Sequence, residues 1–223
     1  MNRLVSWFCK IFIAPIVKFL MIKEVRGLEN IPKENFILAA NHQSHLDELA
    51  TGYICVPRRL HFIGQTDQYT GLIKLILYIV YFIGGVIRLN RKSEASKKKV
   101  VKEAIEVLKK GDCLIVYPEG TRTRTGQMGR GRYGVAVIFL GTGKPILPVG
   151  IKGTFELLPP KGKLKIKRIV EINIGKPLYF KEECEKAKNV NKDSQEYKAL
   201  LEKITNTMMD KIISLKAELD SKT

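Results

Sequence analysis

The chain has 223 residues, the size of one domain or slightly more, and 45% of them are hydrophobic, which is enough for a buried core and argues against disorder. Lysine and arginine number 39 against 22 acidic residues, so the net charge is +17. Such an excess requires anionic partners or an anionic surface, of which nucleic acid, phosphorylated metabolites and lipid headgroups are candidates. The four cysteines, Cys9, Cys55, Cys113 and Cys184, lie too far apart to form a metal knuckle or a redox pair, and a reducing, cytoplasmic setting is the simpler interpretation.

Residues 1–24 form an N-terminal segment of their own. The run from Leu4 to Ile22 is mostly apolar, but Lys10, Pro15 and Lys18 interrupt it and no small-residue cleavage site follows, which disfavours a secretory signal and a spanning helix. On a helical wheel the polar residues share a sector of about 120°: Arg3, Ser6, Lys10 and Lys18. We expect a helix, kinked at Pro15, that lies in the cytoplasmic face of a membrane without crossing it. A helix packed on the rest of the protein is the alternative.

Downstream, short apolar runs alternate with helical patterns. Strands are predicted at residues 36–40, 60–64, 86–89, 113–117, 145–151 and 169–174, and helices at 72–87, 93–110, 132–140 and 195–219. Pro145 and Pro148 argue against a central position for their strand and favour a rigid wall, such as that of an apolar tunnel. The alternation predicts an α/β layered domain over residues 25–223, with a central mixed sheet flanked by helices and a C-terminal amphipathic helix.

His42 and Asp47 form the first candidate site. They follow the apolar run 36–40, and the end of a strand is a common position for an active site in an α/β protein. On one continuous helix they would point about 140° apart, so we expect a turn at His42 and a helix that begins near Ser44. Asp47 could then curl back to the imidazole, fix its tautomer and leave the other ring nitrogen as a general base. The alternatives are a surface turn with a capping aspartate and a metal site that includes His45.

Two further segments carry arginines suited to an oxyanion. Residues 117–124, Tyr-Pro-Glu-Gly-Thr-Arg-Thr-Arg, place a glycine, hydroxyl groups and two arginines in one loop, where Glu119 could orient Arg122. Residues 84–91 end another predicted strand with Arg88 and Arg91, either of which could reach a phosphate. The alternatives are a polar turn with Gly120 at positive φ and a strand end with solvated cations.

Four segments in this order resemble the glycerolipid acyltransferase family, whose best-known members are 1-acylglycerol-3-phosphate acyltransferases. They are Asn41-His-x-x-x-x-Asp47, Gly85 to Arg91, Pro118-Glu-Gly-Thr-Arg122 and Pro145 to Pro148. The resemblance runs from Val25 to Leu178. The histidine–aspartate spacing is weak alone, and the Pro-Glu-Gly-Thr-Arg segment after it makes the combination specific.

The resemblance implies that His42 is the general base on the acceptor hydroxyl and that Asp47 is its orienting partner. It implies a site for the acceptor's phosphate that five residues shape: Arg91, Glu119, Gly120, Thr121 and Arg122. It also implies an acyl-CoA or acyl-carrier-protein donor, a lysophospholipid acceptor, phosphatidate as the product in phospholipid biosynthesis, and a membrane location. No metal or redox cofactor is implied, and the net charge of +17 suits either acidic donor.

Two positions depart from the family pattern. Gln65 stands where such proteins often carry a lysine, and Gly131 where they often carry an aromatic residue, which bears on the acceptor more than on the reaction. Glycerol 3-phosphate, another lysophospholipid or an amino-lipid are therefore alternative acceptors. A non-catalytic basic membrane-surface protein is an alternative of another class. We expect no nucleic-acid partner, because no recognition motif is present and aromatic residues are not interleaved with the basic runs.

Overall fold

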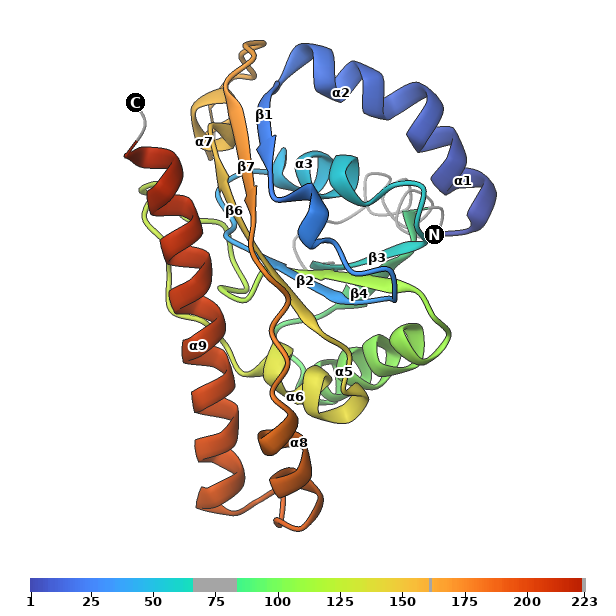
Figure 1. Ribbon diagram of the computed structural model, residues 1–223, viewed down its shortest axis with the longest axis vertical. Coiled ribbons are helices and arrows are strands. Elements are labelled where there is room, and N and C mark those ends of the chain that lie inside the picture. The colour runs from blue at the N-terminus through green and yellow to red at the C-terminus, as the bar shows by residue number, and fades with distance from the viewer. Residues whose placement is uncertain (66–83, 161, 222–223) are drawn as a thin grey trace.

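The computed structural model describes residues 1–65, 84–160 and 162–221, and within them seven strands form one sheet (Figure 1). The strands are β1 (Ile22–Arg26), β2 (Ile37–Ala40), β3 (Leu60–Gln65), β4 (Val86–Leu89), β5 (Cys113–Val116), β6 (Ile146–Lys152) and β7 (Val170–Ile174). The helices of four or more residues are α1 (Arg3–Phe8), a π-helical turn η1 (Cys9–Ile13), α2 (Ala14–Leu20), α3 (Asp47–Cys55), α5 (Glu94–Lys109), α6 (Gly134–Thr142), α7 (Thr154–Leu157), α8 (Lys181–Lys188) and α9 (Gln195–Asp220). The helix predicted at 72–87 lies almost entirely outside the described residues.

The sheet is mixed, as the sequence predicts. Its strand order is β1-β7-β6-β2-β5-β3-β4, in which β6 and β7 are antiparallel and the other neighbours are parallel. The prediction that proline keeps residues 145–151 from the centre was wrong, since β6 lies between β7 and β2. Pro148 fits there because its carbonyl faces the end of β7, where Gly175 N donates to it at 2.9 Å. The Pro148 nitrogen, which has no hydrogen to donate, points to the same side. The hydrogen-bond ladder between β6 and β7 begins only at Val149 and Ile174, so this nitrogen lies outside it.

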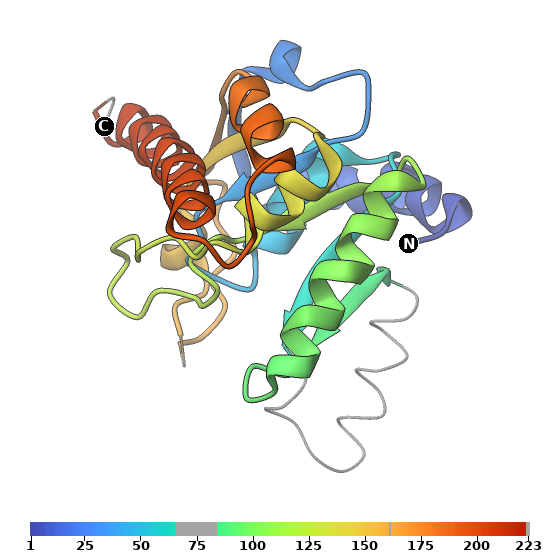
Figure 2. The same cartoon turned by 90° about the horizontal axis from the view of Figure 1, so that it is seen from below.

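Helices cover both faces of the sheet, as the burial of β2 requires. All four residues of β2 are fully buried, with Ile37 and Ala39 in one apolar cluster and Leu38 and Ala40 in the other. Residues of α2 and α3 pack in the cluster of Leu38, and residues of α5, α6 and α9 pack in the cluster of Ile37 (Figures 1 and 2). The domain therefore has three layers, helix, sheet and helix.

The helix α9 lies against β6 at very close range. A Cβ atom added at Gly150, in the middle of β6, would come within 2.6 Å of the Lys216 nitrogen and 2.7 Å of the Leu215 carbonyl carbon. Glycine thus allows the helix backbone to pack directly on the strand backbone.

Residues 3–20 form one helical segment, α1, η1 and α2. A kink was expected at Pro15; the structure has a π-helical turn just before it, in which Ala14 N donates to Cys9 O, and Pro15 lies in the first turn of α2. One side of the segment, with Ala14 and Val17, is buried in the core, as is Met21 directly after it. The segment thus packs on the body of the protein with a face of mostly small side chains.

The opposite side of this segment presents large apolar side chains to the outside, with Leu4 82% and Phe19 78% exposed. Ser6, expected to share a polar sector with Arg3, Lys10 and Lys18, is instead buried, and its Oγ donates to the Arg58 carbonyl at 2.8 Å. In the part of the chain that the structure describes, no helix is long and apolar enough to cross a membrane.

Apart from the four-residue helix α7, two elements were not predicted from the sequence. The edge strand β1 contains the boundary placed between residues 24 and 25, and its residues, Ile-Lys-Glu-Val-Arg, do not alternate between apolar and polar. The other is α8, which is mostly charged and buries only Glu183. Neither has the apolar periodicity on which the predictions depend.

Candidate active site

Four neighbouring strands, β2, β5, β3 and β4, are parallel, so their carboxyl ends meet at one edge of the sheet. His42 follows β2, Tyr117 follows β5, Gln65 ends β3, and Arg91 follows β4. This topology gathers the predicted motifs, which are scattered along the sequence, and the edge is where ligands bind in open α/β sheets.

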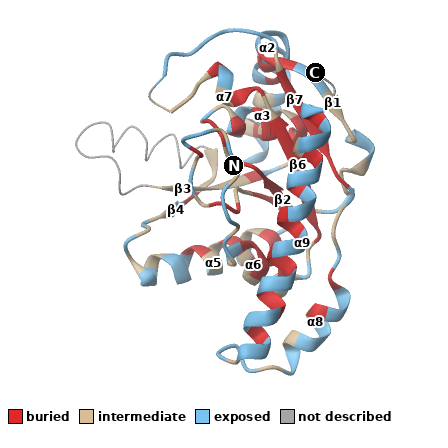
Figure 3. Ribbon diagram, turned by 90° about the vertical axis from the view of Figure 1, so that its left-hand side faces the viewer, coloured by how far each residue is buried: buried red, intermediate tan, exposed pale blue. Residues whose placement is uncertain are grey.

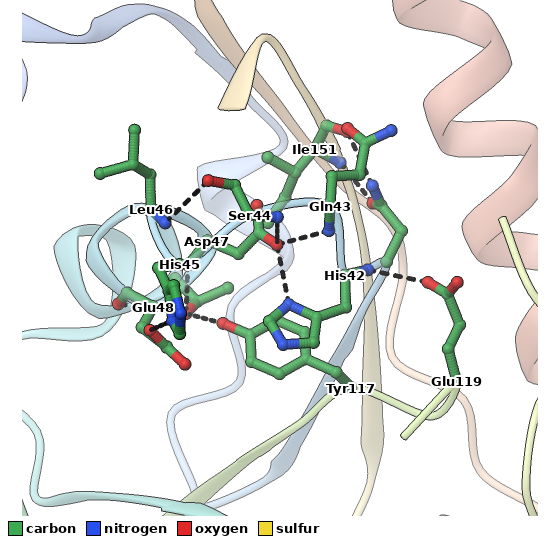
Figure 4. A network of polar contacts seen from close by, with 12 residues as sticks. His42, Gln43, Ser44, His45, Leu46, Asp47, Glu48, Tyr117, Glu119 and Ile151 are labelled. Carbon is green, nitrogen blue, oxygen red and sulfur yellow. Dashed lines mark hydrogen bonds and ion pairs between the residues drawn. The ribbon is translucent and has the colours of Figure 1, made fainter. Parts of the chain in front are cut away.

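Asp47 holds the His42 imidazole through its Nδ1 atom. The Nδ1 atom of His42 lies 2.8 Å from Asp47 Oδ2 (Figure 4). Asp47 is the first residue of α3, three residues beyond the predicted helix start, and its carboxylate curls back as expected. The same oxygen accepts the main-chain N–H groups of Gln43 at 2.6 Å and Ser44 at 2.8 Å. Since the ionised carboxylate only accepts, Nδ1 carries the proton and Nε2 is left with its lone pair.

The turn that carries His42 is anchored to the sheet and to a neighbouring loop. Asn41 is fully buried, and its side-chain amide pairs with the main chain of Ile151 in β6, accepting at 2.7 Å and donating at 2.9 Å. Ser44 Oγ donates to the carbonyl of Leu158 at 2.8 Å. The sequence gives no reason to assign these roles, because the partners are main-chain groups far along the chain.

The loop after β5 holds both main-chain polar groups of His42. The His42 N–H donates to Glu119 Oε1 at 2.8 Å, and the His42 carbonyl accepts from Thr123 N at 3.0 Å. Glu119 Oε2 accepts from Gly129 N at 2.6 Å, so both carboxylate oxygens bind main-chain donors. Burial raises the pKa of Glu119, and the N–H groups of Gly129 and His42 oppose that shift. Gly120 has φ of 69°, as the tight turn after Pro118 requires.

Tyr117 is a residue of this site to which the sequence assigned no role. Its ring stacks on the His42 imidazole, with centroids 4.0 Å apart and an interplanar angle of 11°. Its hydroxyl lies 3.1 Å from Thr51 Oγ1, which donates to the Asp47 carbonyl at 2.9 Å. Burial raises the pKa of Tyr117 well above its ordinary value, so the phenol stays neutral. The one sequence signal was an aromatic residue directly before the Pro-Glu-Gly-Thr-Arg segment.

A cavity of about 790 Å³ opens in front of His42. Of the residues predicted for the site, His42, Arg91, Thr121 and Arg122 line it. Asp47, Glu119 and Gly120 lie behind this lining: Asp47 is fully buried, Glu119 is engaged with main chain, and Gly120 packs on the Arg132 side chain. An apolar part of the wall comes from the N-terminal helical segment and α3, with residues that were not predicted for the site: Cys9, Ile13, Ala14, Val17, Leu49 and Tyr53. The cavity thus joins a polar end at His42 to an apolar wall.

The two departures from the family pattern have different structural settings. Gln65 lines the cavity, and it pairs with Leu89 in the register of β3 and β4. Gly131 lies against α9, where an added Cβ would come within 2.6 Å of Met209 Cγ and 3.0 Å of Thr205 Cγ2. The absence of an aromatic side chain at residue 131 is therefore explained by helix packing, whereas Gln65 bears directly on the site.

Comparison with known families identifies the class of protein to which this fold and site belong. Residues 23–152, more than half of the chain, match the acyltransferase family, and the chain belongs to that family. Among solved structures it is similar to the crystal structure of a 1-acyl-sn-glycerophosphate acyltransferase, PlsC, from Thermotoga maritima, with a TM-score of 0.67 and 27% identity over 97% of this chain and 79% of that one.

Its relatives include two proteins named 1-acyl-sn-glycerol-3-phosphate acyltransferase. The chloroplastic protein of Brassica napus is 29% identical over 178 residues, which are 74% of this chain and 48% of the relative. The protein of Pseudomonas aeruginosa is 28% identical over 171 residues, which are 74% of this chain and 62% of the relative. The chain spans about half the length of the curated relatives it matches.

Proposed function

We propose that this chain is an enzyme that transfers a fatty acyl group from a thioester, acyl-CoA or acyl-carrier protein, to the free hydroxyl of 1-acylglycerol-3-phosphate. The product is phosphatidate, an intermediate of phospholipid biosynthesis. The observation that carries the proposal is the His42–Asp47 pair, with its 2.8 Å contact, at the polar end of a cavity that also has arginines and an apolar wall. The names of the relatives support the choice of acceptor.

In this proposal His42 Nε2 removes the proton from the acceptor hydroxyl as its oxygen attacks the thioester carbonyl carbon. Asp47 holds the imidazole in the required tautomer and stabilises the imidazolium that forms. The tetrahedral intermediate then collapses, the C–S bond breaks, and the thiolate leaves with the proton from His42. The acyl group thus passes directly from the thioester to the acceptor, and no acyl-enzyme forms.

Arg91 and Arg122 are proposed to bind the acceptor's phosphate, because both line the cavity that His42 faces. Thr121 adds a hydroxyl to the same wall. Glu119 and Gly120 shape this site indirectly, through the main-chain contacts of Glu119 and the positive φ of Gly120. Binding the phosphate fixes the distance between the acceptor hydroxyl and Nε2.

The N-terminal segment, residues 1–24, is proposed to lie in the cytoplasmic face of a membrane. One side of it packs on the body and lines the cavity, while Leu4 and Phe19 on the other side are largely exposed. A lipid acceptor could then reach the cavity from the bilayer without passing through water. The variant Leu4→Gln/Phe19→Gln should bind vesicles less tightly than wild type, whereas Ile213→Gln, an exposed apolar position on α9, should bind normally.

The experiment that tests the function is transfer from radiolabelled acyl-CoA to lysophosphatidate in detergent micelles, with a panel of alternative acceptors and an acyl-carrier-protein donor. We expect transfer to lysophosphatidate. Because Gln65 lines the cavity, the panel includes glycerol 3-phosphate, other lysophospholipids and an amino-lipid. Transfer only to an unphosphorylated acceptor would contradict the phosphate site. No transfer from either donor to any acceptor, with vesicle binding intact, would favour a non-catalytic membrane-surface protein.

A further inference from the structure

Residues 162–168 form an exposed connection between α7 and β7 that the proposed reaction does not use. Their sequence is Gly-Lys-Leu-Lys-Ile-Lys-Arg, and all seven are exposed. Leu164 is 58% and Ile166 71% exposed, and each is flanked on both sides by a basic residue. Single exposed apolar residues are ordinary on protein surfaces, but two that alternate with three lysines form a defined amphipathic segment.

Two hydrogen bonds place this segment beside the N-terminal helical segment. Arg168 Nε donates to the Ile22 carbonyl at 2.7 Å, and Val170 N donates to the Met21 carbonyl at 2.8 Å, both directly after α2. Two residues before Gly162, Pro160 lines the cavity of His42. Figures 1 and 3 show the connection at the same end of the molecule as α2. The exposed Phe19 of α2, this segment and the cavity wall at Pro160 therefore belong to one region of the surface.

We propose that residues 162–168 are a second membrane contact, in which Leu164 and Ile166 insert into the interfacial region of an anionic bilayer. Lys163, Lys165 and Lys167 then bind headgroup phosphates, since their long side chains allow the charge to stay at headgroup level while the backbone lies low. The interleaved apolar side chains favour a lipid surface over a nucleic acid, which would need stacking or base contacts.

The second contact has a consequence that rests on the proposed function. If the N-terminal helical segment were the one membrane contact, the protein could still rotate about the axis of that helix. A second contact through residues 162–168, which adjoin the end of α2 and follow Pro160 of the cavity wall, restricts that rotation and keeps the cavity close to the lipid surface. Membrane binding by residues 162–168 itself does not depend on the reaction.

The first test is a measurement of depth. Trp7 is the one tryptophan in the chain, so Trp7→Phe/Ile166→Trp reports on residue 166 alone. On vesicles of phosphatidylcholine and phosphatidylglycerol we expect a blue shift of its emission and quenching by brominated acyl chains. Emission that stays at its value in water, on vesicles that sediment the protein, would overturn the proposal.

The second test separates the local contact from net charge. Leu164→Ser/Ile166→Ser should weaken vesicle binding about tenfold, and Ile213→Ser, at an exposed position of α9, should not. Lys163→Gln/Lys165→Gln/Lys167→Gln should weaken binding to anionic vesicles on the order of a hundredfold and leave binding to neutral vesicles unchanged. Lys97→Gln/Lys98→Gln/Lys99→Gln removes the same charge from exposed positions of α5 and should have a much smaller effect.

Equal losses in the two lysine variants would mean that only net charge matters, and would overturn the proposal. Activity toward micelle-dispersed acceptor, where no bilayer is present, should be unchanged in the Leu164→Ser/Ile166→Ser variant. An inactive wild-type protein whose vesicle binding still depends on residues 163–167 would refute the proposed function and leave the membrane contact standing.

Discussion

The main-chain N–H of His42 donates a 2.8 Å hydrogen bond to the carboxylate of Glu119, 77 residues later in the sequence. The His42 carbonyl is held by Thr123 N of the same loop. The two motifs are thus joined through backbone groups, and the position of the imidazole depends on the loop after β5 as well as on Asp47. Substitutions in that loop are expected to act on catalysis at a distance.

His42→Ala should abolish transfer almost completely, and Asp47→Asn should lower kcat about 10²–10⁴-fold with little change in KM. The asparagine oxygen would take the place of Asp47 Oδ2, because Gln43 N and Ser44 N donate there, so the tautomer would be kept but the negative charge that stabilises the imidazolium would be lost. Steady-state kinetics with the acceptor varied measures both. His45→Ala, at a half-exposed neighbour that lines the cavity but lies near Glu48 rather than Asp47, is the control and should be active. Equal activity of His42→Ala and wild type would remove His42 from the mechanism.

Glu119→Gln should lower both kcat and thermal stability. A glutamine offers one acceptor oxygen where two main-chain N–H groups need one each, and an unpaired buried donor costs about 1–3 kcal/mol. The readouts are the midpoint of thermal unfolding and kcat for lysophosphatidate. If Glu119 contacted the substrate instead, KM would change without any loss of stability, and the indirect role would be wrong.

Tyr117→Phe should keep most of the activity, whereas Tyr117→Leu should lose about three- to tenfold in kcat, because stacking of this kind contributes about 0.5–1.5 kcal/mol. Phenylalanine preserves the ring on the His42 imidazole and loses only the contact with Thr51. We expect KM to stay constant in both variants. A larger loss in Tyr117→Phe than in Tyr117→Leu would show that the hydroxyl, and not the ring, matters.

Arg122→Ala should raise KM for lysophosphatidate about tenfold or more, since a charge-assisted hydrogen bond to phosphate contributes about 1.5–3 kcal/mol. It should raise KM less for an uncharged monoacylglycerol, which has no phosphate to lose. Arg130→Ala removes an exposed arginine of the same loop that does not line the cavity, and serves as the charge control. Similar KM values in the two variants would argue against a phosphate contact by Arg122.

The ion pair between α8 and α9 should make stability depend on pH. The pKa of Glu183 is lowered, mainly because Lys203 Nζ donates to it at 2.6 Å. A lowered folded-state pKa adds stability above the ordinary glutamate value, and this contribution is lost as the pH falls through the lowered value. Urea unfolding should therefore separate wild type from Glu183→Gln at about pH 7 and not at about pH 3. Glu185→Gln, in an exposed pair, should differ little from wild type at either pH.

Most of the sheet could be predicted because its strands are short apolar runs that end at polar or glycine residues. The strands β2 to β7 begin and end within one residue of their predicted positions. The central position of β6 was not predicted because of Pro148. Whether a strand tolerates proline depends on which neighbouring strand the proline nitrogen faces, and this depends on the strand order. The edge strand β1 has one buried residue, Ile22, and so carries no apolar pattern.

The contact of Asp47 with His42 could be predicted because the two residues lie five apart and a turn must join them. Tyr117 and Asn41 were quoted in the motifs, yet their roles could not be predicted, because stacking on His42 and pairing with Ile151 depend on how β5 and β6 flank β2. The apolar wall from Ile13 and Val17 likewise depends on where the N-terminal segment packs. Sequence spacing captures local geometry, and tertiary neighbours decide the rest.

The close approach of α9 to Gly150 limits how this protein can be engineered. Replacement of a strand glycine by valine or isoleucine is a common route to a thermostable variant, because branched residues favour extended backbone. At Gly150 such a replacement should destabilise the protein, because even an alanine Cβ would push the Lys216 backbone away and expose β6. A library that aims at a hardier biocatalyst should therefore keep residue 150 fixed and diversify the exposed positions of α9.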